Sequence, residues 1–593
     1  MRLTMTFLCL LLASAGWAQQ TADSVQPESS IAGVFETSSD AVQRALAAKS
    51  SGETVQSDTW MVAAANPLAV EAGARILRAG GNAADAMVAV QAVLGLVEPQ
   101  SSGLGGGAFL VWYDAASDKL TTLDGRETAP LAATPTLFQD DKGEPLGFFD
   151  AVVGGRSVGT PGTPALMALA HQKWGRLDWA PLLAEATELA RNGFTVSPRL
   201  AGLVDQDAER LSRFATTAAY YLPGGTPIKA GDVLKNPEYA NTLQALANEG
   251  VLAFYSGSLA GSIVDTVRSA PGNPGVLSTL DLAVYAVKER EAVCARYRVY
   301  QVCGMGPPSS GALTVGQILG MLEPFDLAAL GAKNPESWRL IGDASRLAFA
   351  DRGRFMADSD FVPVPTKGLV APGYLAQRAK LLGGPMALTD VGPGSPEFDH
   401  ALNWADDTSI EFPSTSHISI VDGQGNVLSM TTTIENAFGS RLMVGGFLLN
   451  NELTDFSFRT HVDGVPIANR LEPGKRPRSS MAPTIVLKDG KPVLAVGSPG
   501  GSRIIGYVAK TIIAHLDWGL DVQQAVSLPH AINRFGTFDL EDGTDAVALQ
   551  GALESIGFDV SVRDLNSGLH AISIGGQLTG GADPRREGIA LGE

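Results

Sequence analysis

Ser414-Thr415-Ser416-His417 places three hydroxyl groups and an imidazole directly before the alternating apolar residues 418–422. A half-buried strand explains the alternation but not the hydroxyls. A threonine hydroxyl is a poor nucleophile until a base takes its proton, and an N-terminal α-amine, with a reference pKa of about 7.7–8.0, can be that base. Breaking the Ser414–Thr415 bond would give Thr415 both groups, so we predict cleavage there. The alternative is an ordinary threonine at a strand edge.

The residues after Thr415 predict a hairpin that could support this nucleophile. Two alternating segments flank Gly423-Gln424-Gly425. If Asp422 pairs with Asn426 across a three-residue loop, Thr433 lies directly opposite Thr415, with Cβ atoms about 4.5–5.5 Å apart. The Thr433 hydroxyl could then hold the Thr415 hydroxyl in place. A two-residue loop would shift the pairing by one position.

The run GSPGGSRII, at 497–505, lies between an apolar strand and a helix. Its Gly500 and Gly501 offer consecutive backbone N–H groups without side chains near the positive end of that helix, which suits an oxyanion hole. The alternative is a glycine-rich turn with no chemical role. The spacing is not that of a nucleotide-binding loop.

Helices and strands alternate in both halves of the chain, which predicts an α/β layered sandwich. The segments at 66–81 and 82–99 predict two helices, the second capped by Asn82, and those at 108–114 and 119–125 predict a hairpin. Helical patterns dominate from about 162 to 385. Beyond residue 415 come two hairpins and the helix SRIIGYVAKTIIAHLDWG.

The N-terminal residues predict an exported protein. MRLTMTFLCLLLASAGWA, residues 1–18, combines Arg2, an apolar run and small residues near Ala18, which is typical of a signal peptide. The alternative is a short buried helix or a membrane anchor. We therefore expect a periplasmic or secreted protein. Residues 19–58 predict a flexible extension, with order from about Trp60.

The position of the expected cleavage divides the chain into two parts. Residues 387–413 are rich in Pro, Gly and Asp and show neither the helical nor the strand periodicity of apolar residues, which predicts a flexible, exposed linker. Cleavage after this linker would give a large subunit, 59–414, and a small catalytic subunit, 415–593.

The composition indicates an acidic globular protein. The 593 residues are 45% hydrophobic and 18% charged, enough to bury at least one large core. The formal net charge of −18 makes a nucleic acid or an anionic membrane surface an unfavourable partner. Beyond the N-terminal region, the sequence has no run near the roughly 18 uninterrupted apolar residues that a membrane span needs.

Cysteine and histidine usage points to structure rather than metal chemistry. Cys294 and Cys303 flank a predicted strand or hairpin, and an oxidising compartment allows a disulfide between them. Two buried thiols are the alternative. Neither cysteine has a second ligand nearby, so we expect no metal site and no cofactor. We interpret His417 as structural, because the freed α-amine already supplies a base.

Several of these segments resemble, in order along the chain, the motifs of the γ-glutamyltransferases. The resemblance runs from about Trp60 to the C-terminus. It implies the N-terminal-nucleophile hydrolase fold, a four-layered αββα sandwich, and a precursor that cuts itself into two subunits, which form a heterodimer. The motifs are GLGGGAF at 103–109, DGRETAP at 124–130, TSHISIVDGQGNVLSMTTTIENAFGS from Thr415, LLNNELTDFS, KRPRSSMAPTIV and GSPGGSRII.

The resemblance implies roles on the nucleophile side of the site. Thr415 is the nucleophile in both self-cleavage and turnover, and Thr433 supports it. Gly500 and Gly501 bind the oxyanion.

The resemblance also implies roles on the substrate side. Arg126 takes the substrate α-carboxylate, a task that suits a guanidinium fork, with Ser479 and Ser480 assisting. Glu452 and Asp455 bind the α-ammonium. Taken singly, each has a simpler explanation. Arg126 could form a surface ion pair, the two serines could be turn hydroxyls, and the two acidic residues could belong to a solvated loop.

Two features depart from the best-known members of that family. Glu435, followed by Asn436, stands where they have Asn, and a carboxylate there could pair more strongly with an ammonium or disfavour a substrate that lacks one. Residues 456–475, which correspond to the lid region, contain Phe456 and Phe458 but no Tyr or Trp. An aromatic gate is therefore not expected, which could open the acceptor side.

The leading hypothesis is a γ-glutamyltransferase that acts on glutathione or another γ-glutamyl compound. It would pass the acyl group to an amino acid, a peptide or water. A glutaryl or cephalosporin acylase of the same superfamily is the closest alternative. A non-catalytic exported protein that binds glutamyl peptides is an alternative of a different class.

Overall fold

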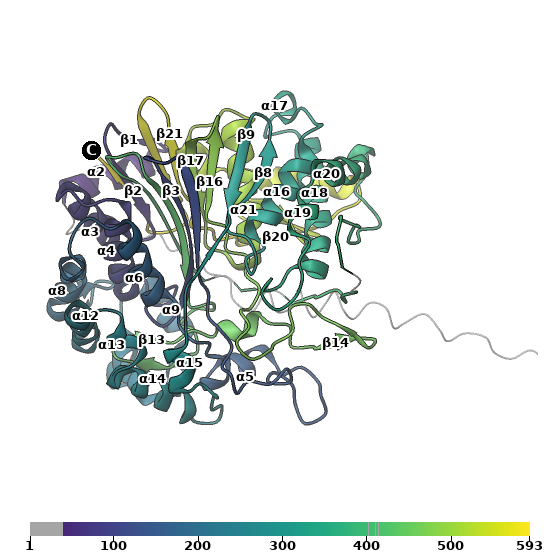
Figure 1. Ribbon diagram of the computed structural model, residues 1–593. Helices are drawn as coiled ribbons and strands as arrows, with labels where there is room; N and C mark the ends of the chain where they lie inside the picture. Colours follow the sequence, from purple (N-terminus) through teal and green to yellow (C-terminus); the bar gives the residue numbers. More distant parts are fainter. Residues whose placement is uncertain (1–38, 401–402, 410, 413) are drawn as a thin grey trace, which may run out of the picture.

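Two stacked β-sheets form the middle of the molecule, and helices cover both outer faces (Figure 1). The computed structural model describes residues 39–400, 403–409, 411–412 and 414–593; the predicted signal peptide lies outside them. Within these ranges each of the two main sheets has seven strands. The sequence of helices, sheet, sheet and helices is the four-layered αββα sandwich that was predicted.

The first sheet brings together strands from both sides of the predicted cleavage site. Its order is β23-β2-β10-β11-β3-β4-β7, and every neighbouring pair is antiparallel. The strands β10 and β11, which follow Thr415, lie between β2 and β3, which precede it. The strands are Met61–Ala64 (β2), Gly107–Asp114 (β3), Lys119–Gly125 (β4), Lys288–Arg290 (β7), Ser416–Val421 (β10), Val427–Thr433 (β11) and Ile589–Gly592 (β23).

The second sheet packs face to face on the first. Its order is β1-β22-β21-β17-β16-β9-β8, again antiparallel throughout. Met61, Val111, Ile485 and Ile572 are among the buried side chains between the sheets. The strands are Val55–Ser57 (β1), Val293–Tyr297 (β8), Tyr300–Gly304 (β9), Thr484–Lys488 (β16), Lys491–Gly497 (β17), His570–Ile574 (β21) and Leu578–Ala582 (β22).

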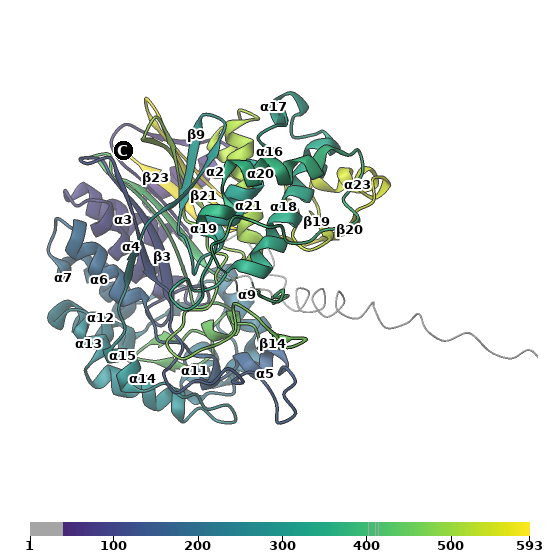
Figure 2. The ribbon, with the colours of Figure 1, turned by 45° about the vertical axis from the view of Figure 1, so that its right-hand side comes forward.

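Each sheet is covered by its own layer of helices (Figure 2). Ile418 and Ile420 of β10 face the helices on the first sheet, whereas Val421 faces the second sheet. This explains why a strand with period-2 alternation is buried on both faces. The first layer contains α3 (Pro67–Arg78), α4 (Ala83–Val97), α6 (Thr163–Trp174), α7 (Trp179–Leu182), α8 (Ala184–Asn192) and α12 (Pro237–Glu249); the second contains α16 (Gly311–Leu322), α18 (Pro335–Phe355), α20 (Pro372–Ala379), α21 (Ile504–Leu516) and α22 (Val522–Ser527).

Shorter elements complete the chain. Further helices are α5 (Phe148–Val152), η1 (Gly155–Ser157), α9 (Pro198–Gln206), α10 (Ala208–Leu211), α11 (Ala215–Tyr221), η2 (Pro223–Gly225), α13 (Leu252–Tyr255), α14 (Ser258–Arg268), α15 (Thr279–Ala283), α17 (Leu327–Leu330), α19 (Thr366–Leu369), η3 (Lys380–Gly383), η4 (Glu452–Asp455), η5 (Gly501–Arg503), η6 (Asp545–Leu549) and α23 (Gln550–Ser555). Further strands are β5 (Phe194–Thr195), β6 (Val233–Leu234), β12 (Met443–Val444), β13 (Phe447–Leu448), β14 (His461–Val462), β15 (Val465–Pro466), β18 (Ala531–Asn533), β19 (Thr537–Glu541) and β20 (Asp559–Arg563).

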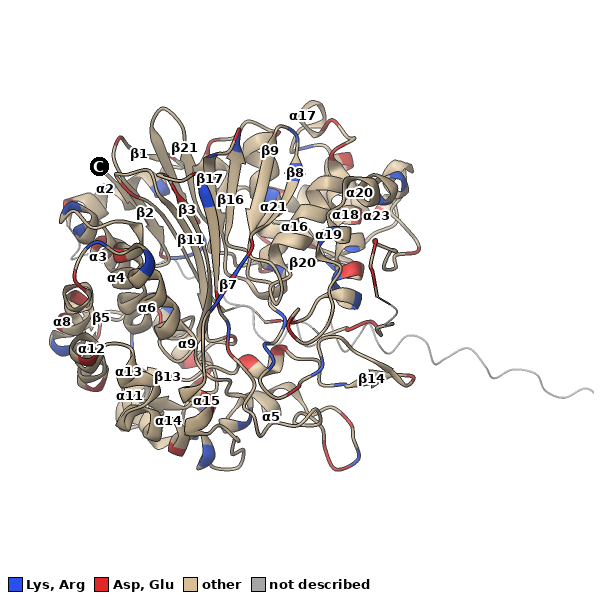
Figure 3. Cartoon of the chain, in the orientation of Figure 1, with Lys and Arg blue, Asp and Glu red and all other residues tan. Residues whose placement is uncertain are grey.

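The predicted secondary structure agrees well with these elements. The Asn82 side chain caps α4 and forms a capping box with Asp85, as its position suggested. The hairpin β3–β4, the long helical region before residue 385 and helix α21 are all present. Figure 3 shows that the sandwich strands carry few charged residues, while most Lys, Arg, Asp and Glu lie on helices and loops.

The predicted flexible extension at 19–58 is wrong for its second half. Helix α2 (Asp40–Ser50) packs against β23, and β1 pairs with β22. Lys49 fastens the helix by donating to the carbonyls of Arg586 at 2.9 Å and Gly588 at 2.7 Å. Order therefore begins before Trp60, because this segment gains partners from the far C-terminus that local composition does not reveal.

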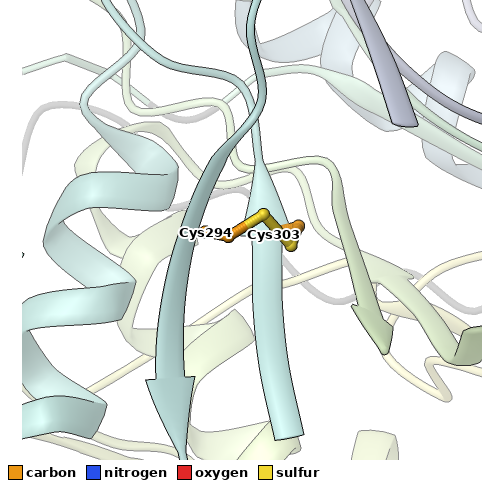
Figure 4. Close-up of a disulfide and its surroundings, with 2 residues drawn as sticks. All are labelled: Cys294 and Cys303. Atoms are coloured by element: carbon orange, nitrogen blue, oxygen red, sulfur yellow. A yellow bond between two sulfur atoms is a disulfide. The ribbon is translucent and has the colours of Figure 1, made fainter. Parts of the chain in front are cut away.

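The second sheet contains a disulfide at its edge (Figure 4). Cys294 of β8 lies directly opposite Cys303 of β9, and the two sulfurs are bonded, with Cα atoms 4.1 Å apart. The alternative of two separate thiols therefore does not apply to this structure.

No single helix among the described residues has both the length and the apolar character to cross a membrane. One bent helix pair, Pro237–Glu249 with Leu252–Arg268, meets that test only when the two are combined.

Candidate active site

Thr415 lies at the start of β10, in the middle of the first sheet. Asp422 N donates to Asn426 O at 3.1 Å, and Ser416 pairs with Thr432. The hairpin therefore has the three-residue loop and the register that were predicted. As a result Thr433 lies opposite Thr415, and their Oγ1 atoms are 3.2 Å apart.

Hydrogen bonds surround the peptide bond between Ser414 and Thr415. The Thr415 hydroxyl lies within hydrogen-bond distance of the Ser414 carbonyl oxygen and of Thr433 Oγ1, and its single proton can be donated to either. Thr433 Oγ1 in turn donates to the Ser414 carbonyl oxygen at 3.2 Å and accepts from Glu435 N at 2.9 Å. On the other side of the bond, Arg586 Nη1 donates to Thr415 O at 3.1 Å. The Thr433 hydroxyl thus lies where negative charge would develop if Thr415 attacked this carbonyl.

Arg126 and two carboxyl groups form a buried cluster beside the threonines. The Arg126 side chain follows strand β4 and donates through Nη1 to Glu452 and through Nη2 to Asp455 Oδ2 at 2.5 Å. It also donates to the carbonyl oxygens of Pro477 at 3.2 Å and Arg478 at 2.8 Å. Burial opposes its positive charge, but the two carboxylates outweigh that effect and raise the pKa of Arg126.

The carboxyl groups of this cluster outnumber its arginine. Burial raises the pKa of both Glu452 and Asp455 well above the ordinary range. Repulsion from neighbouring carboxyl groups adds to both shifts, from Glu127 and Glu435 for Glu452 and from Glu452 and Glu411 for Asp455. Glu127, next to Arg126, has its pKa raised to about 8, mainly by burial. In the described part of the chain, Glu452 Oε2 and Asp455 Oδ1 receive no hydrogen bond from a donor. These oxygens are free to accept one from a cation.

Glu435 extends the acidic side of the site. It follows β11 with a left-handed backbone, φ 76°, and its buried side chain accepts from Asn451 Nδ2 and from Phe412 N at 3.3 Å. Burial, followed by the nearby Asp455, raises its pKa well above the ordinary value.

The two predicted serines also line the cavity. Ser480 Oγ donates to the carboxylate of Glu411 and accepts from Arg352 Nη2 at 2.9 Å. Ser479 Oγ accepts from Met481 N at 3.1 Å. In this uncut chain the Ser480 hydroxyl is therefore occupied by the segment that precedes the cleavage site.

Of the two predicted oxyanion glycines, Gly501 lines the cavity and Gly500 does not. Both have positive φ, at 57° and 134°. A Cβ at Gly501 would lie 2.4 Å from the carbonyl oxygen of Glu411, so a side chain there would collide with the chain leading to the nucleophile. The oxyanion role of both glycines remains a prediction.

One small cavity gathers the predicted catalytic and substrate-binding residues except Gly500. Its volume is about 20 Å³, close to the space that one water needs, so no glutamyl group fits in the uncut chain. Phe412 also borders a second, open cavity of about 950 Å³, which is lined in part by residues of the hairpin β14–β15. The smaller cavity is lined by Arg126, Glu411, Phe412, Ser414, Thr415, Thr433, Glu435, Glu452, Asp455, Ser479, Ser480, Met481, Gly501 and Ile504.

The predicted exposed linker is wrong at its C-terminal end. Glu411 and Phe412 are each 5% exposed and form part of the cavity wall. Sequence reasoning also missed the two arginines that hold Glu411, Arg352 and Arg478. The only sequence signal for this buried contact was the acidic residue Glu411 itself, four positions before Thr415. No periodic pattern of apolar residues around it indicates burial.

His417 has no contact with the Thr415 hydroxyl among the hydrogen bonds of the described residues. Its Nδ1 lies 2.9 Å from Thr431 Oγ1 and its Nε2 lies 3.0 Å from Ser419 Oγ. Burial, with a contribution from His570, lowers its pKa well below the ordinary value. Both ring nitrogens are bound within the hairpin and the lowered pKa favours the neutral ring, in agreement with a structural role.

A threonine at the head of a central strand in an αββα sandwich, beside a second hydroxyl and a closed polar cavity, defines an enzyme of the N-terminal-nucleophile hydrolase class. The chain belongs to the gamma-glutamyltranspeptidase family, whose model matches residues 69–593.

Individual relatives cover nearly the whole chain. It is 38% identical to the glutathione hydrolase proenzyme of Bacillus subtilis, over 90% of this chain and 91% of that protein. Its fold is similar to that of a cephalosporin acylase from Bacillus halodurans, with a TM-score of 0.80 and 27% identity, covering 91% of this chain and 97% of that one. The gamma-glutamyltranspeptidase of Helicobacter pylori gives a TM-score of 0.54 and 34% identity, covering 56% and 94%.

Proposed function

We propose that this protein is a γ-glutamyltransferase with glutathione hydrolase activity, activated by cleavage before Thr415. The observation that carries the proposal is the convergence, on one cavity, of the Thr415–Thr433 hydroxyl pair with Arg126 and the carboxyl groups of Glu435, Glu452 and Asp455. The first pair supplies a nucleophile and its support, and the second group supplies charges of both signs for an amino-acid head group.

Self-cleavage uses groups that already surround the bond. Thr415 Oγ1 attacks the Ser414 carbonyl carbon and releases its proton, which is balanced by the proton that the Thr415 nitrogen takes up, while Thr433 donates to the carbonyl oxygen. The C–N bond breaks, the Thr415 nitrogen takes up a proton, and an ester joins Ser414 to Thr415 Oγ1. Water then hydrolyses that ester, which leaves a free carboxylate on Ser414 and a free α-amine and hydroxyl on Thr415.

Turnover repeats this chemistry on a bound substrate. The α-amine takes the proton of the Thr415 hydroxyl, whose oxygen attacks the γ-carbonyl carbon of the donor. The leaving amine takes a proton as the C–N bond breaks, and the γ-glutamyl group remains as an ester on Thr415. An amino acid, a peptide or water then releases it. The Gly501 amide, and Gly500 beside it, would stabilise the oxyanion.

The charge balance of the cavity favours a γ-glutamyl donor. Its head group carries one carboxylate and one ammonium, so it adds no net charge to a buried cluster. The free oxygens of Glu452 and Asp455 can accept from the ammonium, with Glu435 nearby. Arg126 and the serine pair would take the carboxylate. Burial and neighbouring carboxyl groups raise the pKa of Glu452 and Asp455, so this cluster disfavours further negative charge, whereas an ammonium would favour the ionised carboxylates.

A glutaryl acylase is the second candidate, supported by the structural likeness to a cephalosporin acylase. A glutaryl group would bring a carboxylate without an ammonium into the same acidic cluster, which costs more. Comparing kcat/KM for γ-glutamyl-p-nitroanilide and glutaryl-p-nitroanilide decides between them. We expect faster γ-glutamyl cleavage; faster glutaryl cleavage would favour the acylase.

A non-catalytic binding protein would remain a single full-length chain on a denaturing gel. The enzyme should instead give two fragments. They would stay together as a heterodimer, because β10 and β11 of the small fragment lie between β2 and β3 of the large one.

Export to the periplasm or the medium is part of the same proposal. The signal-like residues 1–18 and the Cys294–Cys303 disulfide, which an oxidising compartment maintains, both support it. Fractionation of cells that express the full chain tests it: the processed protein should leave the cytoplasm, and removal of residues 2–18 should retain it there.

A further inference from the structure

Glu411, four residues before the nucleophile, is bound by charged and polar side chains from distant parts of the chain. Its carboxylate receives hydrogen bonds from Arg352 of helix α18 and from Ser480, and Arg478 Nε lies 3.4 Å away. The Glu411 side chain is 5% exposed, and those of the two arginines are 1% and 0% exposed. This buried set, Glu411 with Arg352, Arg478 and Ser480, is called the Glu411 clamp below.

Other groups hold the clamp's arginines in place. Arg352 Nε donates to Ser310 Oγ at 2.8 Å, and Arg478 Nη2 lies 3.1 Å from Asp407 Oδ2. Each guanidinium group therefore has a partner besides Glu411. This pair of cations can therefore position the segment that precedes the cleavage site.

Glu411, Phe412 and Ser414 are each bound to other parts of the chain as well. Ser502 N donates to Glu411 O at 3.2 Å, and Phe412 N donates to Glu435. Ser414 Oγ donates to the carbonyl of Gln100 at 2.8 Å. Of these three residues, only Glu411 has a side chain that is held by charged partners.

The clamp is not a proton switch. Burial disfavours the charged carboxylate, but Arg352 and Arg478, with the Ser480 hydrogen bond, lower the pKa of Glu411 to about 2. Asp407 and Asp455 also face the clamp through Arg478. The lowered pKa favours the ionised form of Glu411, so its carboxylate can act as a charged anchor at neutral pH.

We propose that Glu411 is a positioning residue for self-cleavage, whose clamped carboxylate keeps the Ser414 carbonyl in place next to the Thr415 hydroxyl. This inference rests on the proposed self-cleavage. The clamp then serves only once, because Glu411 and Phe412 form part of the wall of the small cavity, which has no room for the donor while they are in place. Their departure after the cut frees the Ser480 hydroxyl and reopens the site.

The test follows cleavage of the full chain, made by cell-free synthesis with labelled methionine and sampled over time on denaturing gels. Glu411→Gln, which keeps the size but loses the charge, should slow the cut by about tenfold to hundredfold, the usual consequence of a small misplacement of reacting groups. Glu411→Asp, which keeps the charge on a shorter arm, should fall between. Asp406→Asn is the matched control: Asp406 pairs with Arg354 in the same segment but is 50% exposed, and it should cut at the parent rate.

A second measurement separates positioning from simple neutralisation of the two arginines. In Glu411→Ala, added acetate can enter and balance their charge but cannot hold the chain, so the slow rate should persist. Recovery of the parent rate with acetate would overturn the positioning role. Parent-like cleavage in both Glu411→Gln and Glu411→Asp would overturn it too. If the parent chain itself never cuts, the proposed function fails instead, so the two failures are distinguishable.

Discussion

Thr433 Oγ1 lies 3.2 Å from Thr415 Oγ1 and donates, also at 3.2 Å, to the carbonyl oxygen of Ser414. One hydroxyl thus contacts both the attacking atom and the oxygen that gains charge during the attack. Glu435 N fixes this hydroxyl by donating to it at 2.9 Å. The same arrangement can serve the self-cleavage and, with a substrate carbonyl in place of Ser414, the later turnover.

Removal of the Thr433 hydroxyl should therefore slow self-cleavage. Loss of one donor to a developing oxyanion costs about 10²–10³ in rate, so we expect Thr433→Ala to remain mostly uncut when the parent is fully processed. Thr433→Ser keeps the hydroxyl and should cut at a rate near that of the parent. Gel analysis of the labelled chains measures both. Equal rates in all three would show that Thr433 has no part in the reaction.

Arg126 should prove essential for folding as well as for substrate binding. It is fully buried, and its removal leaves Glu452 and Asp455 without their cation. Breaking such a pair costs about 3–5 kcal/mol, so Arg126→Gln should unfold at markedly lower denaturant than the parent, both measured in a Thr415→Ala background that stays uncut. Arg126→Lys keeps the charge and should lose less stability. A parent-like midpoint for Arg126→Gln would contradict the buried ion-pair cluster.

Glu435 should make the uncut protein less stable as the pH rises. Its folded pKa is raised, so it stays protonated in the folded state above about pH 4.3, where the unfolded chain already ionises. Stability that is present below that pH is lost as the pH climbs toward the folded pKa. In the Thr415→Ala background, Glu435→Gln should therefore unfold at a higher temperature than its parent at about pH 8, and at a similar temperature at about pH 4. A lower unfolding temperature for Glu435→Gln at the higher pH would show that the carboxylate is stabilised instead.

Asp455 should control selectivity for the α-ammonium. Its Oδ1 accepts no hydrogen bond from the residues that the structure describes. Asp455→Asn removes the negative charge while keeping the shape of the side chain. We expect kcat/KM for γ-glutamyl-p-nitroanilide to fall by at least about tenfold relative to glutaryl-p-nitroanilide, the scale of a lost charge-assisted hydrogen bond. An equal loss on both substrates would indicate general damage to the site rather than a contact with the ammonium.

The placement of Thr433 could be predicted because local chemistry fixes the hairpin. The period-2 pattern sets the faces of β10 and β11, and Gly425 supplies the positive φ, 82°, that the loop needs. Asp422 accepts from the loop amides of Gln424 and Asn426 and so closes it. Register then follows from counting, and with it the partner of Thr415.

The burial of Glu411 could not be predicted, because irregular chain has no period from which to infer a buried face. Its partners, Arg352 and Arg478, lie 59 and 67 positions away. The ordered position of helix α2 was not predicted either, because Lys49 donates to carbonyls more than 500 positions further along the chain. Contacts of this kind depend on the completed fold rather than on neighbouring residues.

The most direct test of the central claim is the N-terminal sequence of the small fragment from purified, active protein. The account predicts that it begins Thr415-Ser416-His417-Ile418 and that Thr415→Ala stays full-length and inactive. Active protein that remains a single chain, or a fragment that begins at any other residue, would contradict it.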